Sequence, residues 1–175
     1  MYFSGMSLRN IEFKARVLSI EELENRLLSL SPRCIGLDHQ IDTYFNTPNG
    51  RLKLREGNIE NALIHYEREN TAGSKESKII LYQHQPSPAL KEILTKTLGI
   101  KIVVDKKRKI YFIENVKFHF DEVASLGQFT EVEVIDETGT MSLESLRETC
   151  EHNRKFLGIR EEELLEGSYS DLLAG

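Results

Sequence analysis

Stretches in which charged and apolar residues alternate are the chemically informative feature of this sequence. In R-L-K-L-R at 51–55, an extended strand would place Arg51, Lys53 and Arg55 on one face and the two leucines on the other. Neighbouring like charges on a strand face repel one another, so this face requires a compensating anion. The same alternation yields further cations (Lys14, Arg16, Arg68, Lys106 and Arg108) and a set of carboxylates (Glu12, Asp121, Glu131 and Glu133).

Closure of a sheet built from these strands would turn the charged faces inward and leave the apolar faces for helices to cover. Burial of so many charges without a ligand is costly for every unpaired ion. A triphosphate would satisfy the cations, and Mg²⁺ or Mn²⁺ would satisfy the carboxylates, because arginine binds phosphate well and hard cations prefer oxygen ligands. The ordinary alternative is an antiparallel sheet with one solvated face.

The elements that would position these charges are mostly strands. Alternation predicts strands at 10–17, 51–55, 64–68, 77–82, 102–113, 117–122 and 130–135. Helices are predicted after Ser19, after Ser87-Pro88 and after Ser142, because these residues are typical of helix starts, and a short fourth helix is predicted at 161–166. The expected fold class is therefore α+β, with seven or eight antiparallel strands and helices between them.

Composition narrows the class of protein. The chain has 175 residues, of which 39% are apolar and 29% charged, as in a folded domain. A net charge of −5 argues against a nucleic-acid binder, and no apolar run approaches the length of a membrane span. The two cysteines form no disulfide framework, which suits the reducing cytoplasm. We expect one domain over 8–175, preceded by an unpatterned extension at 1–7.

Six segments in a fixed order, and a seventh at the C-terminal end, resemble the CYTH superfamily. These triphosphate tunnel metalloenzymes include class IV adenylate cyclases, thiamine triphosphatases and inorganic triphosphatases, and the class IV cyclase-like branch is the most similar. The segments are N-I-E-F-K (10–14), Q-I-D-T-Y-F (40–45), R-L-K-L-R (51–55), Y-E-R-E (66–69), D-K-K-R-K-I-Y (105–111), F-H-F-D-E-V-A-S-L-G-Q-F-T-E-V-E (118–133) and G-S-Y-S-D-L-L (167–173). The resemblance implies an eight-stranded antiparallel closed barrel that forms a tunnel, with helices packed outside.

The resemblance also implies roles for residues. Glu12 and Lys14 match the second acid and the lysine of the family's ExExK signature, and both are expected in catalysis. Triphosphate-binding cations are expected at Lys14, Arg51, Lys53, Arg55, Arg68, Lys75, Lys106 and Arg108. Ligands for Mg²⁺ or Mn²⁺ are expected at Glu12, Asp121, Glu131 and Glu133. The main departure is Asn10, which stands where the signature has its first glutamate and supplies a neutral oxygen without charge.

Three functions are compatible with these residues. The first is a metal-dependent hydrolase of inorganic or organic triphosphate. The second is a class IV-type adenylate cyclase, which would convert ATP to cyclic AMP and pyrophosphate and would need a purine pocket. The third is a domain that binds or senses triphosphate without catalysis, which Asn10 suggests. In each case the partner is a small molecule such as ATP or inorganic triphosphate, and the cyclase branch makes a homodimer plausible.

Overall fold

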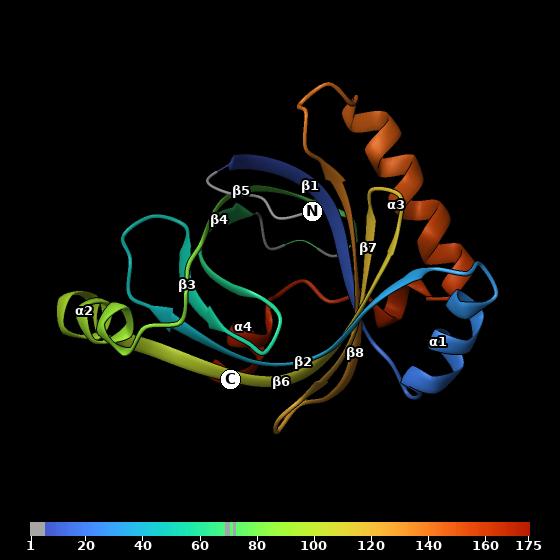
Figure 1. Ribbon diagram of the computed structural model, residues 1–175. Coiled ribbons are helices and arrows are strands. Elements are labelled where there is room, and N and C mark those ends of the chain that lie inside the picture. Colours follow the sequence, from blue (N-terminus) through green and yellow to red (C-terminus); the bar gives the residue numbers. More distant parts are fainter. Residues whose placement is uncertain (1–5, 69–70, 72) are drawn as a thin grey trace.

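The chain folds into a closed antiparallel β-barrel with its helices outside or at one rim (Figure 1). This computed structural model describes residues 6–68, 71 and 73–175. The strands are β1 (Met6–Arg16), β2 (Arg33–Phe45), β3 (Arg51–Glu56), β4 (Asn61–Arg68), β5 (Lys75–Gln83), β6 (Ile100–Ile113), β7 (Val116–Val123) and β8 (Gly127–Asp136). Around the barrel they run β1-β5-β4-β3-β2-β6-β7-β8, and β8 pairs with β1. The predicted eight-stranded closed barrel is confirmed.

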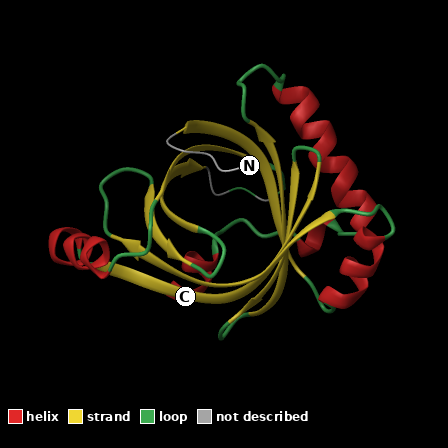
Figure 2. Cartoon of the chain, viewed as in Figure 1, coloured by secondary structure: helices red, strands yellow, loops and turns green. Residues whose placement is uncertain are grey.

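Within the described residues, four α-helices accompany the barrel (Figure 2). They are α1 (Ile20–Leu28), α2 (Pro88–Leu98), α3 (Leu143–Leu157) and α4 (Tyr169–Ala174). The first three were predicted from their end signals. Ser19 and Ser142 cap α1 and α3 by accepting hydrogen bonds from backbone amides at 3.3 and 3.1 Å. Gly158 ends α3 in the left-handed conformation, at a φ of 74°.

The larger core lies between the barrel wall and two helices. Figure 1 shows α1 and α3 against the outside of β1, β7 and β8. The strands alternate, so on β1 the side chains of Ile11 and Phe13 join this core while Glu12 and Lys14 point into the barrel. Its other buried members include Leu27, Phe118, Phe120, Val132, Leu146 and Leu157. The apolar outer face thus fixes which side chains line the interior.

Several predicted boundaries differ from the structure. β2 was not predicted, because a bulge between Cys34 and Gly36 interrupts its alternation and polar residues occur on both of its faces. The fourth predicted helix is only a 3₁₀ turn at Glu161–Glu163, whereas α4 was missed because six residues show no helical period. Of the predicted N-terminal extension, residues 6 and 7 begin β1, and residues 1–5 lie outside the described residues.

Among the described residues, no helix has the length and apolar character needed to cross a membrane.

Candidate functional site

A cavity of about 1170 Å³ runs inside the barrel, and most of the predicted site residues line it. The register explains their convergence, because Glu12 of β1 lies opposite Glu133 of β8, and Lys14 lies opposite Glu131. The predicted residues that line the cavity are Glu12, Lys14, Lys53, Arg55, Arg68, Lys106, Arg108, Glu131 and Glu133. Arg51, Lys75 and Asp121 are placed behind this lining or at one rim, in contacts described below.

One group of cations surrounds Asp42 on β2. Arg55 donates two hydrogen bonds of 2.8 Å to the Asp42 carboxylate, and Lys106 and Lys53 approach Oδ2 at 2.6 and 3.2 Å. The Asp42 side chain is 1% exposed. Burial by itself would raise the pKa of Asp42, but the charges of Arg55, Lys106 and Lys53 outweigh it and hold that pKa well below its usual range. Asp42 is therefore the common counter-ion of three predicted phosphate-binding residues.

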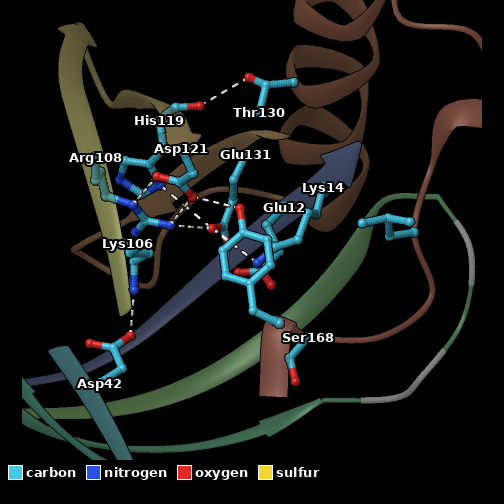
Figure 3. Close-up of polar contacts among 12 residues, drawn as sticks. Glu12, Lys14, Asp42, Lys106, Arg108, His119, Asp121, Thr130, Glu131 and Ser168 are labelled. Atoms are coloured by element: carbon cyan, nitrogen blue, oxygen red, sulfur yellow. Dashed lines mark hydrogen bonds and ion pairs between the residues drawn. The ribbon is translucent and has the colours of Figure 1, made fainter. Parts of the chain in front are cut away.

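A second group surrounds Arg108 on β6 (Figure 3). Its guanidinium donates to both oxygens of Asp121 at 2.7 and 2.6 Å and to Glu131 at 2.9 Å. Lys14 lies 3.2 Å from the same Glu131 oxygen and 3.9 Å above the ring of Tyr169. The Tyr169 hydroxyl donates to Asp121 at 2.6 Å. Asp121, a predicted metal ligand, is thus engaged by Arg108 and by α4.

The remaining predicted cations have partners near the C-terminal segment. Arg68 forms a close ion pair with Glu12. Arg51 pairs with Asp171 of α4 at 2.9 Å. Lys75 donates to the backbone oxygens of residues 165 and 166. Burial lowers the pKa of Lys75 to about 8, and the nearby charge of Arg68 acts in the same direction. Lys75 thus anchors the chain before α4, and its predicted role in phosphate binding stays a prediction.

The buried cations are compensated within the protein. The sequence had suggested that a bound triphosphate would satisfy the cations and that metal ions would satisfy the carboxylates, but the described carboxylates of Asp42, Glu12, Asp121 and Glu131 each accept a cation. Glu60, in the connection between β3 and β4, receives Arg55 at 3.0 Å and also pairs with Lys117. An anion that bound these cations would have to replace internal ion pairs, which favours a ligand with several negative charges.

The carboxylates of β8 carry the features of a cation site. Burial raises the pKa of Glu133 to about 7, and the nearby negative charges of Glu131 and Glu12 add to this effect. Ligand atoms of His119, Glu131 and Glu133 lie within 4.8 Å of one another. The buried Oδ1 of Asn10 and both ring nitrogens of His119 have no hydrogen-bond partner among the described residues. Carboxylates that repel one another, next to oxygen and nitrogen atoms that could coordinate a metal, fit a divalent cation of the Mg²⁺ or Mn²⁺ type.

Some residues of the site were missed in the sequence. His119 shares its strand face with Lys117 and Asp121, so alternation on β7 contained the signal for it. Asp42 lay in a stretch whose strand was not predicted, and Glu60 follows no period because it belongs to a turn. Tyr169 reaches the site only because the C-terminal segment folds back, with the Leu165 amide donating to the Lys14 carbonyl at 2.9 Å.

The two rims of the barrel differ in character. Leu8, at the start of β1, and Ile135, near the end of β8, line the cavity at one rim. Other apolar side chains at this rim are Ile35, Ile59, Leu81 and Phe112. The opposite rim carries α4 and its contacts with Arg51 and Asp121. Charged residues line the cavity at the same rim, among them Arg33, Glu114, Lys117 and Glu137, so its mouth combines apolar and charged side chains.

Comparison with known proteins relates this barrel to one domain family. The model of the CYTH domain matches residues 8–169. The PH1012 protein from Pyrococcus horikoshii has 25% identity and a TM-score of 0.78, with 95% of this chain and 99% of that chain covered. A candidate adenylate cyclase from Vibrio parahaemolyticus has 16% identity and a TM-score of 0.80, with 97% and 100% covered. HpAC1 from Hippeastrum, described as having a dominant triphosphatase activity, has 17% identity and a TM-score of 0.60, with 94% of each chain covered. No curated protein matches the chain significantly.

The family match begins at the third residue of β1, covers the other seven strands in full and ends at the first residue of α4. The closed barrel is the architecture that the resemblance implied, and its interior carries cations and carboxylates together. Fold and family match thus agree over nearly the whole described chain, and the protein belongs to the CYTH domain family.

Proposed function

We propose that this protein is a metal-dependent hydrolase that binds a triphosphate inside the barrel. One observation carries the proposal: cations from β1, β3, β4 and β6 and carboxylates from β1 and β8 line a single cavity. Phosphoryl transfer depends mainly on positioning and charge neutralisation, so it needs this combination of groups more than a nucleophilic side chain. The triphosphate-binding residues are Lys14, Arg51, Lys53, Arg55, Arg68, Lys75, Lys106 and Arg108.

The roles within this proposal follow from the contacts. Arg55 and Arg108 are held by Asp42 and Asp121 through paired hydrogen bonds, which fix the two guanidinium groups in the lining of the cavity. Lys14 stabilises the charge that develops on the transferred phosphoryl group. Burial lowers the pKa of Lys14, although Glu131 opposes this effect. Glu12, Glu131 and Glu133, with Asp121 behind them, would hold Mg²⁺ or Mn²⁺. When bound, such an ion neutralises charge on phosphoryl oxygens.

The apolar side chains among the charged residues of this rim suit an organic triphosphate and keep the cyclase reaction as a second candidate. Leu8, Ile35, Leu81, Phe112 and Ile135 offer a surface on which a base or another flat group could pack. A nucleotide lying this way would extend its phosphates toward Arg55 and Arg108. In a cyclase the ribose 3′-hydroxyl would attack the α-phosphorus and release pyrophosphate.

A product assay separates these candidates. Purified protein is incubated with ATP and, separately, with inorganic triphosphate, each with Mg²⁺ or Mn²⁺, and the products are identified. We expect orthophosphate without cyclic AMP, whereas cyclic AMP with pyrophosphate would establish the cyclase.

Lys106→Met should lose most of the activity, because Lys106 lines the cavity. Lys107→Met is the matched control, since Lys107 is the exposed neighbour on the outer face of β6. If both variants lost the same share of activity, the assignment of Lys106 to the triphosphate site would be wrong.

Asn10 allows a test of the third alternative, a domain that binds triphosphate without turnover. Its amide nitrogen donates to Glu12 at 3.3 Å, and its Oδ1 has no partner among the described residues. Asn10→Glu would add a negative charge beside Glu12, so we expect lower thermal stability without metal and a larger stabilisation by Mn²⁺ than in the wild type. We expect no large gain in turnover.

The measurements are melting temperatures with and without Mn²⁺, together with turnover, and Asn10→Gln is the neutral control of similar size. A large gain in turnover that is confined to Asn10→Glu would favour a natural domain that has lost its activity. It would therefore count against the proposed hydrolase.

A further inference from the structure

The imidazole of His119 is buried and lacks, among the residues that the structure describes, the hydrogen-bond partners that such a group normally has. The residue is 1% exposed, and neither ring nitrogen has a hydrogen-bond partner among the described residues. Burial of an unsatisfied donor or acceptor destabilises the folded protein, so a buried histidine of this kind requires an explanation. The carboxylate oxygen Oε2 of Glu131 lies 3.7 Å from Nδ1, which is too far for a hydrogen bond.

The position of His119 is fixed by its strand. It lies on β7 directly opposite Glu131 of β8, and its backbone carbonyl accepts a hydrogen bond from the buried hydroxyl of Thr130 at 3.0 Å (Figure 3). On the same strand, Phe118 and Phe120 pack in the outer core, so alternation directs His119 inward. The ring is therefore held at the inner wall beside the β8 carboxylates.

The ligand atoms available here are close enough for one ion. An atom each of His119, Glu131 and Glu133 lies within 4.8 Å of the others. Two atoms that each lie about 2.1 Å from one metal ion can be up to about 4.2 Å apart, so small side-chain rotations would bring all three into its coordination sphere. Arg108 and Lys14 compete for Glu131, but each has another contact, with Asp121 and with the Tyr169 ring respectively.

We propose that His119 is a nitrogen ligand of the cation site and, with Glu131 and Glu133, makes it selective for Mn²⁺ and later first-row ions over Mg²⁺. This inference rests on the metal dependence in the proposed function. Mg²⁺ strongly prefers oxygen ligands and keeps its waters, whereas transition-metal ions accept imidazole readily. A site made only of carboxylates would not discriminate in this way.

Electron spin echo envelope modulation of bound Mn²⁺ tests the inference without turnover. The full-length protein is loaded with Mn²⁺ alone and with Mn²⁺ plus inorganic triphosphate. We expect ¹⁴N modulation from a coordinated imidazole in the wild type, its loss in His119→Gln, and its retention in His84→Gln. His84 is the control because it is a histidine that lines the cavity outside the cluster of His119, Glu131 and Glu133.

Titration of metal binding gives a second readout. His119→Gln should weaken Mn²⁺ binding by at least the roughly 10- to 100-fold that loss of an outer-sphere partner costs, and should weaken Mg²⁺ binding less. Absence of ¹⁴N modulation from the wild type under both conditions, or its persistence in His119→Gln, would overturn the inference. If His119→Gln does not fold, the same comparison of ¹⁴N modulation is made between the wild type and His119→Asn. Nitrogen coordination without hydrolysis would refute the hydrolase alone, and hydrolysis with an all-oxygen spectrum would refute this inference alone.

Discussion

Replacing Glu133 by glutamine is expected to abolish metal-dependent turnover while the barrel stays folded. Glutamine keeps the shape of the side chain but removes the negative charge that a divalent cation requires. The loss should be at least about a hundredfold, the scale of one lost electrostatic contact in a transition state. The fold should tolerate the change, because burial and the charges of Glu131 and Glu12 already disfavour a carboxylate at this position.

Steady-state kinetics with Mg²⁺ and Mn²⁺, together with circular dichroism, would measure both effects. Glu122→Gln is the matched control, since Glu122 is exposed on the outer face of the neighbouring strand β7. Glu131→Gln should lose turnover as well, but it should also lose stability because Arg108 and Lys14 would lack one of their partners. Normal turnover in both the Glu131 and the Glu133 variant would remove these residues from the proposed metal site.

Asp42→Asn should produce the largest loss of stability among the site variants. Asp42 is the counter-ion of Arg55, Lys106 and Lys53, and breaking a buried ion pair from one side costs about 3–5 kcal/mol. Inorganic triphosphate should restore much of this stability, because its charges would take the place of the missing carboxylate. The free energy of unfolding should therefore depend far more strongly on triphosphate in the variant than in the wild type.

Urea unfolding with and without inorganic triphosphate would test this expectation. Asp105→Asn is the control, because Asp105 is exposed on β6 and its pair with His39 lies on the surface, where such a pair contributes about 0–1 kcal/mol. If triphosphate stabilised the Asp42 variant no more than the wild type, Arg55, Lys106 and Lys53 would not be binding it. The assignment of this group as a phosphate site would then be wrong.

The wall of the barrel could be predicted because alternation is a local property of a strand. Ile11 and Phe13 against Glu12 and Lys14 already separate the outer face from the inner face, and the helices after Ser19 and Ser142 were recognisable from their first residues. The inward charges of β3, β6 and β8 follow from the same period.

The pairing of charges could not be predicted, because it depends on contacts between residues far apart in the chain. Asp42 meets Lys106 across 64 positions, and Tyr169 meets Asp121 across 48. A six-residue helix such as α4 has too few turns to show a period, so neither its existence nor its docking near Lys14 was visible.

The sequence by itself determined the family resemblance, the strand faces and the candidate charges, since these depend on residue type and spacing along one segment. Only the tertiary structure decided which carboxylate balances which cation. It also placed His119 beside Glu131, with no hydrogen-bond partner for its ring within the described part of the chain, and it put α4 at the rim opposite Leu8 and Ile135. The physical reason is barrel closure, because the register of eight strands converts local alternation into a specific three-dimensional set of neighbours.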